Sequence, residues 1–377
     1  MSLQLELDAF KSVADTRFPP GDFVLLASLL VAPGSLRLRR SPVGMLPLAF
    51  VATMSYGVLL ALTYAGNVSS NALQVKLFGT LSLGTWCLVT IYYVQRGHVD
   101  RIVKTWVVGM LFWGVVSYID WRVANILPGL DAKTSSRFGG MQFDPNNAGA
   151  AFGVVAVVTW RFGHRMFATA GARFLALGLA CAFLGLTFSR GGLIGALLTA
   201  MVIFVVGRDS ATRRARAVAA AVFIFGAAVV SGYVSDALES YSVRPDTVST
   251  RDMEATRAIE ELAESRGLGI GLGTHLENNP QIVHNTAIWL TVEMSIVGLM
   301  FFGLLLSVPT VVTLRGRRYD PDLAMAILAG HLVMIVASMG IEAIMQRQWW
   351  LLVGLCAAPS LRAAPTPRAD PQRTPVG

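Results

Sequence analysis

Five arginines stand in polar stretches between apolar runs, where a charged side chain can meet a ligand at the edge of a membrane. They are Arg137, Arg190, Arg251, Arg257 and Arg347. A guanidinium is always charged and matches a phosphate through two parallel hydrogen bonds. A single arginine at a membrane boundary commonly does no more than extend its charged tip into water. Several together favour an anionic ligand, and a lipid phosphate or diphosphate suits that position best.

One histidine lies where a polar stretch meets an apolar run, at His284-Asn285. A lone histidine is more often structural, but the positive end of a helix favours the neutral imidazole, which accepts a proton as a general base. Glu293 follows nine residues later, about 13 Å further along a helix. A carboxyl group in a membrane needs a partner, so structural hydrogen bonding is the first role we expect for Glu293.

Asn146 follows Asp144-Pro145, a pattern typical of a turn that leads into a helix. A helix cap is therefore the first role we expect for Asn146. The three cysteines, Cys87, Cys181 and Cys356, lie far apart within apolar runs and predict buried thiols. We find no metal-type spacing and expect chemistry without a metal or a cofactor.

The composition indicates that a membrane must position these residues. Of 377 residues, 54% are hydrophobic and 14% are charged, whereas soluble domains carry about 25% charged residues. The mean hydropathy is +0.57. The net charge of +8 comes with arginines clustered between apolar runs, as in membrane proteins, so we expect no nucleic-acid partner.

The apolar runs predict an all-α polytopic integral membrane protein with about eleven (10–12) transmembrane helices, each needing about 20 residues. The predicted spans are roughly 21–36, 42–65, 77–95, 102–120, 147–161, 166–188, 191–207, 217–234, 285–309, 321–345 and 348–361. Residues 1–20 form a polar lead-in, 21–361 one transmembrane domain, and 362–377 a disordered cytoplasmic tail.

Arginine clusters fall at every second connection, which is the positive-inside pattern and predicts that these connections are cytoplasmic. The clusters lie at 37–40, 96–101, 161–165, 208–216, 315–318 and in the tail. The remaining long connections, about 121–146 and 235–284, then face outward. The second, between the eighth and ninth spans, is the large outer loop.

The large outer loop carries signals for a helix and a glycine-rich turn. Ser249 and Asp252 predict a capping box before a helix at 251–265 that Gly267 ends. Its expected apolar stripe is Met253, Ala258, Leu262 and Ala263. Gly267, Gly269, Gly271 and Gly273 then let the backbone pass close to another surface or a ligand.

Four stretches resemble motifs of the O-antigen ligase-like membrane proteins, a superfamily of O-antigen ligases, O-antigen polymerases and related exopolysaccharide polymerases. The stretches are Leu186-Thr187-Phe188-Ser189-Arg190-Gly191-Gly192; Arg137 to Asn146; Arg251 with 266–273; and His284-Asn285 with Glu293 and Gly298. They occur in the family's order, over about residues 100–310. The chain departs from the pattern at Arg266, where Pro is usual, at Ser295, where Gly is usual, and near Ala255, where an aromatic residue is usual.

The resemblance implies a glycosyltransferase of the bacterial plasma (inner) membrane with its site facing the periplasm or exterior. An undecaprenyl-diphosphate-linked glycan would be the donor, and a glycan or lipid core would supply the acceptor hydroxyl. Arg190 and Arg251 would stabilise the leaving diphosphate, and His284 would take the acceptor proton. The expected substrate-binding residues are Arg137, Asn146, Asn285 and Glu293.

Two other activities remain open. A polymerase of the same superfamily differs only in its acceptor, and no residue decides between them. A transporter or flippase of lipid-linked glycans would carry ionisable residues at the bilayer midplane and broken helices in matched halves. The polar residues of this chain gather at the outer boundary instead, which favours the enzyme.

Overall fold

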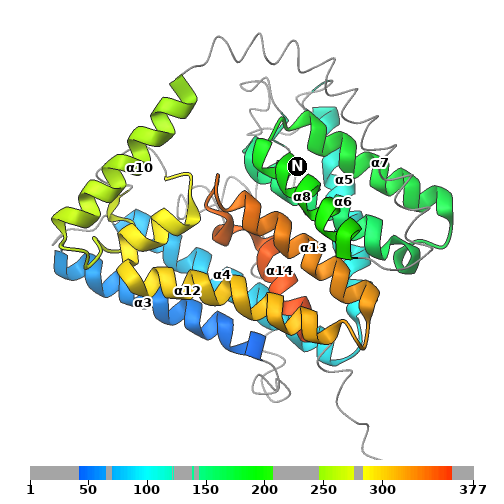
Figure 1. Ribbon diagram of the computed structural model, residues 1–377, viewed down its shortest axis with the longest axis horizontal. Helices are drawn as coiled ribbons and strands as arrows, with labels where there is room; N and C mark the ends of the chain where they lie inside the picture. Colours follow the sequence, from blue (N-terminus) through cyan, green and yellow to red (C-terminus); the bar gives the residue numbers. More distant parts are fainter. Residues whose placement is uncertain are drawn as a thin grey trace, which may run out of the picture.

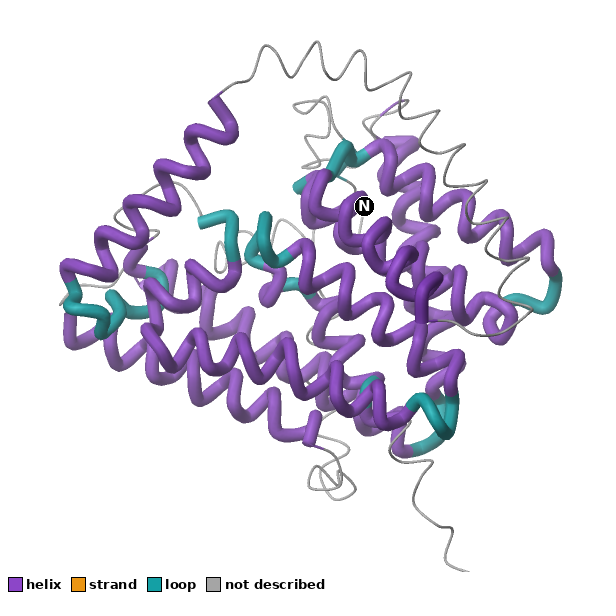
Figure 2. Tube along the Cα trace, in the orientation of Figure 1, coloured by secondary structure: helices purple, strands orange, loops and turns teal. Residues whose placement is uncertain are grey.

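The structure, a computed structural model, describes residues 42–64, 70–120, 122, 138–139, 144–206, 246–275 and 283–358. Within these ranges it is helical and holds no strand (Figures 1 and 2). The all-α prediction is therefore confirmed for the part that is described. The predicted spans 21–36 and 217–234, the lead-in and the tail lie outside the described residues.

Helices in these ranges follow the predicted spans closely. They are α3 (Leu46–Tyr64), α4 (Ser70–Gln95), α5 (Val99–Ile119), α6 (Pro145–Met166), α7 (Ala170–Leu186), α8 (Arg190–Val206), α10 (Asp246–Glu264), α12 (Thr286–Gly316), α13 (Pro321–Ala337) and α14 (Arg347–Leu355), with short 3₁₀ turns η2 (Pro42–Met45) and η6 (Ala343–Met345). α13 packs against α6, α8 and α12, and α14 packs against α4. α13 therefore joins the two halves of the bundle (Figure 1).

Three segments are long and apolar enough to cross a membrane: Pro42–Thr63, Val99–Ile119 and Thr286–Gly316. Ala170–Leu186, Arg190–Ile203 and Pro321–Ala337 are shorter apolar helices. Many large apolar side chains are exposed on these helices, for example Leu59, Phe112, Leu175, Met201 and Met300. Exposing so much apolar surface to water would be unfavourable in free energy, so these surfaces are consistent with residence in a membrane.

Several predicted boundaries are wrong. The basic connection expected at 161–165 belongs to α6, and the spans expected from 77 and up to 309 extend to Ser70 and Gly316. The span expected at 321–345 ends at Ala337, because the backbone turns at Ser338 and the carbonyl of Ser338 accepts a hydrogen bond from the amide of Thr286 at 2.9 Å. The helix expected at 251–265 begins at Asp246, so Ser249 and Asp252 lie within the helix and not at its start. Ala258 packs as predicted, but Met253 is exposed, as is Ala263.

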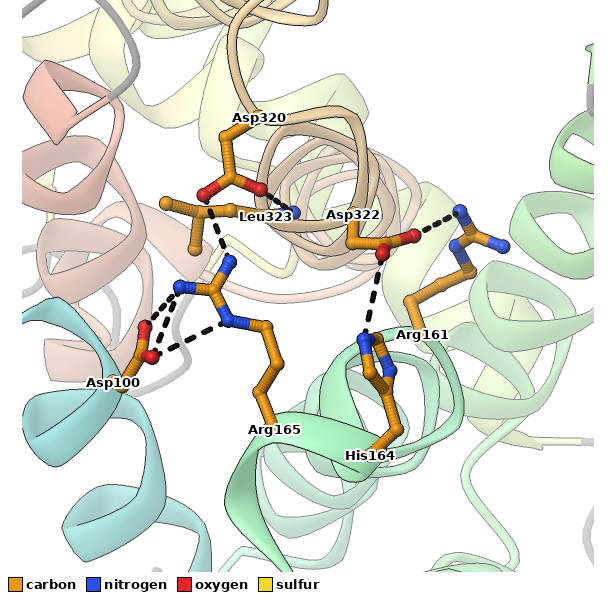
Figure 3. A network of polar contacts seen from close by, with 7 residues as sticks. All are labelled: Asp100, Arg161, His164, Arg165, Asp320, Asp322 and Leu323. Carbon is orange, nitrogen blue, oxygen red and sulfur yellow. Dashed lines mark hydrogen bonds and ion pairs between the residues drawn. The ribbon is translucent and has the colours of Figure 1, made fainter. Parts of the chain in front are cut away.

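Ion pairs hold one end of the bundle, which we call the basic end (Figure 3). Arg165 at the end of α6 contacts Asp100 of α5 at 2.7 Å and Asp320, which precedes α13, at 2.8 Å. Asp322 accepts a hydrogen bond from Arg161 at 3.2 Å and lies 3.4 Å from His164. The arginine clusters at 96–101, 161–165 and 315–318 lie in the terminal turns of these helices or directly beside them. They therefore share one end, as the alternation of the clusters predicts.

Candidate functional site

The start of α6 and the start of α8 are in close contact at the end opposite to the basic end. A Cβ added at Gly192 would lie 2.5 Å from the carbonyl carbon and oxygen of Gly149, so only glycine fits there. The hydroxyl of Ser189 accepts a hydrogen bond from the amide of Gly192 and lies 3.5 Å from the carbonyl oxygen of Asn146. This contact places Asn146 beside Arg190, the exposed first residue of α8.

Asp144, and not Asn146, caps α6. Its carboxylate accepts hydrogen bonds from the amides of Asn146 at 2.6 Å and Asn147 at 3.4 Å, and Pro145 occupies the first helical position. This arrangement is typical of a helix start. The helix start was predicted correctly, whereas the cap role was expected at Asn146, two positions too late.

The turn that presents Arg190 is tightly built. Thr187 donates a hydrogen bond to the carbonyl of Leu184 and accepts one from the amide of Ser189. Phe188 has a φ of 47°, which is uncommon for a residue with a side chain. The amide of Phe138 donates to the carbonyl of Leu186 at 3.1 Å, and the Phe138 ring is buried against Phe152 and Phe183. Phe138 thus fixes its stretch beside the Arg190 turn.

Arg137 lies outside the described residues, so its side chain is not placed. Its neighbour Phe138 is bonded to the end of α7. The first and second resembling stretches therefore meet in space at this point.

The start of α12 lies against the end of α13. Asn285 caps α12, because its side chain accepts hydrogen bonds from the amides of Ala287 and Ile288 at 3.0 and 3.1 Å. The hydroxyl of Thr286 donates to the carbonyl of Ile341 at 2.8 Å. His284 is half-buried just before this cap.

The end of α13 connects the starts of α8 and α12. A Cβ added at Gly191 would lie 3.7 Å from the Cα of Ala337, the last residue of α13. The next carbonyl, that of Ser338, accepts a hydrogen bond from Thr286. Arg190 and His284, which were predicted to act together, therefore lie at the same end of the bundle on helix starts that contact one segment. The positive ends of α8 and α12 favour an anion there.

Arg251 is not brought into this contact. It is exposed near the start of α10, and that end of α10 stands apart from the bundle (Figure 1). Ala258 follows seven residues later, hence on the same face of the helix, and is fully buried. Arg251 consequently projects from the face that α10 turns toward α12, whereas Arg257 lies on another face.

The glycine-rich loop after α10 packs against an interruption in α12. Gly267, Gly269, Gly271 and Gly273 all have positive φ, between 75° and 96°. The amides of Ile270 and Gly271 donate to the carbonyls of Val292 and Glu293 at 3.0 and 2.9 Å. Ser295 has a φ of 55° and a ψ of −148°, which breaks the helix there. The close backbone approach expected of these glycines is confirmed, and its target is α12.

The backbone conformation of Ser295 is unusual for a residue with a side chain. It belongs to a region that glycine occupies with little strain and other residues rarely enter. The Ser295 hydroxyl hydrogen-bonds the carbonyl of Gly267, which offsets part of this strain.

Glu293 is fully buried and lies in a cluster of charges that sequence reasoning missed. Lys76 of α4 forms an ion pair with Glu342 at 2.9 Å, and its ammonium lies 4.3 Å from the centre of the Trp289 ring. Lys76, Glu342 and His275 are ionisable residues that interact with Glu293. Among described residues, no group hydrogen-bonds the Oε2 atom of Glu293. Lys76 and Glu342 stand in apolar runs, and that signal could have singled them out.

His275 was also missed. Its Nδ1 lies 2.6 Å from a carboxylate oxygen of Glu261 on α10, and its side chain is buried. The pair ties the far end of the glycine-rich loop back to α10. In the described ranges, no group of three or more His, Cys, Asp or Glu side chains is placed to hold a metal ion.

No protein-family model matches the chain, and no curated protein matches it.

Proposed function

We propose that the chain is an O-antigen ligase-like glycosyltransferase that moves a glycan from an undecaprenyl-diphosphate donor to an acceptor hydroxyl. One observation carries the proposal. The starts of α6, α8 and α12, with Asn146, Arg190 and His284, gather around the end of α13. They lie at the end opposite to the basic end, where the positive-inside rule predicts the outer face.

The proposed reaction uses charge and one proton transfer. The acceptor oxygen forms a bond to the anomeric carbon, the bond from that carbon to the diphosphate oxygen breaks, and the diphosphate leaves with the electron pair. Arg190, on the positive end of α8, stabilises the charge that develops on the leaving group. His284 accepts the proton of the attacking hydroxyl. Undecaprenyl diphosphate and a longer glycan are the products.

The other proposed residues act around this step. Arg251 lies on the face of α10 that is turned toward α12, and it would contact the diphosphate from that side. Arg137 precedes Phe138 and would contact the diphosphate from the side of the Arg190 turn. The carbonyl oxygen of Asn285 is engaged by the helix cap. Its amide group remains to orient the acceptor.

The proposal is tested by following undecaprenyl diphosphate by mass spectrometry, with purified protein in nanodiscs, a synthetic lipid-linked oligosaccharide and mixed acceptors. We expect acceptor-dependent release that falls about 100-fold in His284→Ala and Arg190→Ala. His98→Ala is the control, because His98 precedes α5 at the basic end and makes no side-chain cap bond. If the protein binds the lipid-linked donor but releases no undecaprenyl diphosphate with any acceptor, the proposal is contradicted.

Product mass distinguishes a ligase from a polymerase. A ligase adds one glycan to a lipid-core acceptor, whereas a polymerase lengthens the glycan of a second lipid-linked molecule. Both use the same leaving group and the same proton acceptor. The same assay therefore serves both activities.

A transporter of lipid-linked glycans is a second candidate that one observation favours. α12 is interrupted at Ser295 beside the buried Lys76 and Glu293 and the half-buried Glu342. Interrupted helices with ionisable neighbours are typical of transport sites. Movement of a labelled lipid-linked glycan across vesicles, with no acceptor present and no bond cleavage, would favour this candidate.

A further inference from the structure

The break in α12 is occupied by backbone from another part of the chain. The amides of Ile270 and Gly271 supply hydrogen bonds to the carbonyls of Val292 and Glu293, immediately before the break at Ser295. Carbonyls at a helix end need such donors, above all away from water. At the break, the loop 265–275 thus supplies amide donors in place of some of those that the next helical turn would supply.

The loop fits in its place because glycine has no side chain. A Cβ added at Gly271 would lie 2.2 Å from the backbone of Ala61 on α3, and one at Gly269 would lie 3.0 Å from the carbonyl oxygen of Glu293. The amide of Leu272 donates to the carbonyl of Gly57 on α3 at 2.8 Å. The loop therefore lies between α3 and α12 in close backbone contact with both. A side chain added at Gly271 or Gly269 would clash with backbone atoms, which cannot move aside as a flexible side chain can.

The same loop is bonded to α10 at both of its ends. The amide of Gly267 donates to the carbonyl of Leu262 at 2.9 Å, and the hydroxyl of Ser295 reaches the carbonyl of Gly267. At the other end, His275 pairs with Glu261. α10 and the first turns of α12 are therefore connected through one short segment that is hydrogen-bonded to both helices.

We propose that the loop 265–275 is a positioning element that sets α10, with Arg251, relative to the start of α12, which follows His284. The proposal rests on the function proposed above, because it assigns both residues to one reaction. The loop touches no reacting atom in this scheme. Its contribution is to keep the two helices at a fixed separation, since a displacement of about 1 Å at an active site can cost 100-fold in rate.

The distance between the two helices is the direct test. Spin labels at Thr256 and Leu304, two exposed positions on α10 and α12, are placed in the full-length protein with its native cysteines replaced. We expect Gly271→Ala to broaden the distribution of distances between the two labels, measured by pulsed electron paramagnetic resonance. Gly267→Ala is the matched control, because Gly267 also has positive φ but has nothing within 4 Å of an added Cβ. An unchanged distribution in Gly271→Ala would overturn the proposal.

A second pair of variants avoids the steric clash and so guards against misfolding. Glu261→Ala removes the pair with His275, whereas Glu260→Ala removes an exposed carboxylate one residue earlier. We expect Glu261→Ala to broaden the distance distribution and to lower kcat about tenfold with donor binding retained, and Glu260→Ala to do neither. A broadened distribution with unchanged kcat would rule out positioning as the role of the loop.

Failure of the two proposals is distinguishable. If wild-type protein releases no undecaprenyl diphosphate, the proposed transferase is wrong. The distance measurement then decides on its own whether the loop fixes α10 against α12, and an unchanged distribution in Gly271→Ala rejects the positioning role.

Discussion

The ammonium of Lys76 and the carboxylate of Glu342 lie 2.9 Å apart, although 266 positions separate them in the chain. Lys76 also lies over the ring of Trp289 on α12. Glu342 follows Ile341, whose carbonyl accepts a hydrogen bond from Thr286. The pair thus fastens α4 to the segment after α13 and to the first turns of α12, next to the candidate site.

Removing the charge of Lys76 should destabilise the protein. Lys76→Met leaves the largely buried Glu342 without its partner, and we expect the free energy of unfolding to fall by about 3 kcal/mol. Unfolding is followed in mixed micelles titrated with SDS. The double variant Lys76→Met/Glu342→Gln should recover most of the loss. Lys104→Met, at an exposed position of α5, is the control, and equal unfolding midpoints for Lys76→Met and this control would show that the pair stabilises nothing.

The contact between α6 and α8 should tolerate no side chain. Gly192→Ala places a Cβ 2.5 Å from the Gly149 backbone, and we expect a loss of about 2 kcal/mol or more together with loss of turnover, since Arg190 would move. Gly178→Ala in α7 meets nothing within 4 Å and should be neutral or stabilising by up to about 1 kcal/mol. Similar behaviour of the two variants in unfolding and turnover assays would contradict the close approach.

Asp320 should show two separable contributions at the basic end. One carboxylate oxygen accepts from the amide of Leu323 at 3.1 Å, and the other accepts from Arg165 at 2.8 Å. Asp320→Asn keeps the helix cap and loses the charge, so it should cost about 1 kcal/mol, whereas Asp320→Ala should cost about 2 kcal/mol. Turnover per folded molecule should stay unchanged in both, because the site lies at the opposite end. A loss of turnover would place the reaction elsewhere.

Ser295 should prefer glycine over alanine. Both substitutions remove the hydrogen bond to Gly267, but only Ser295→Gly removes the strain of the positive φ. We therefore expect Ser295→Gly to be more stable than Ser295→Ala by about 1 kcal/mol in the SDS titration. The reverse order would mean that α12 is not broken at this residue.

Local signals in the sequence predict most of the described helices, because an apolar run of membrane length has few alternatives. They also predict the start of α6 at Asp144-Pro145 and the close backbone approach of the glycine-rich loop to another surface. The grouping of Asn146, Arg190 and His284 at one end follows from the alternation of arginine clusters.

Local sequence signals do not predict contacts between distant parts of the chain. The Lys76–Glu342 pair joins residues in different apolar runs, and no local pattern says which ionisable side chains meet. The break at Ser295 is stabilised by Ile270 and Gly271, whose role becomes visible only when the loop is seen against α12. The early start of α10 at Asp246 was missed because its first turn has no apolar face to mark it.

The break in α12 also matches the helix to the thickness of a bilayer. Thr286–Gly316 has 31 residues, and as one straight helix it would extend about 46 Å, well beyond a hydrocarbon layer of about 30 Å. The part after Ser295, residues 296–316, extends about 31 Å and fits that layer alone. In the proposed transferase, residues 296–316 would cross the hydrocarbon layer, and the preceding turns, which hold Glu293, would lie at the depth of the lipid head groups, where a diphosphate lies.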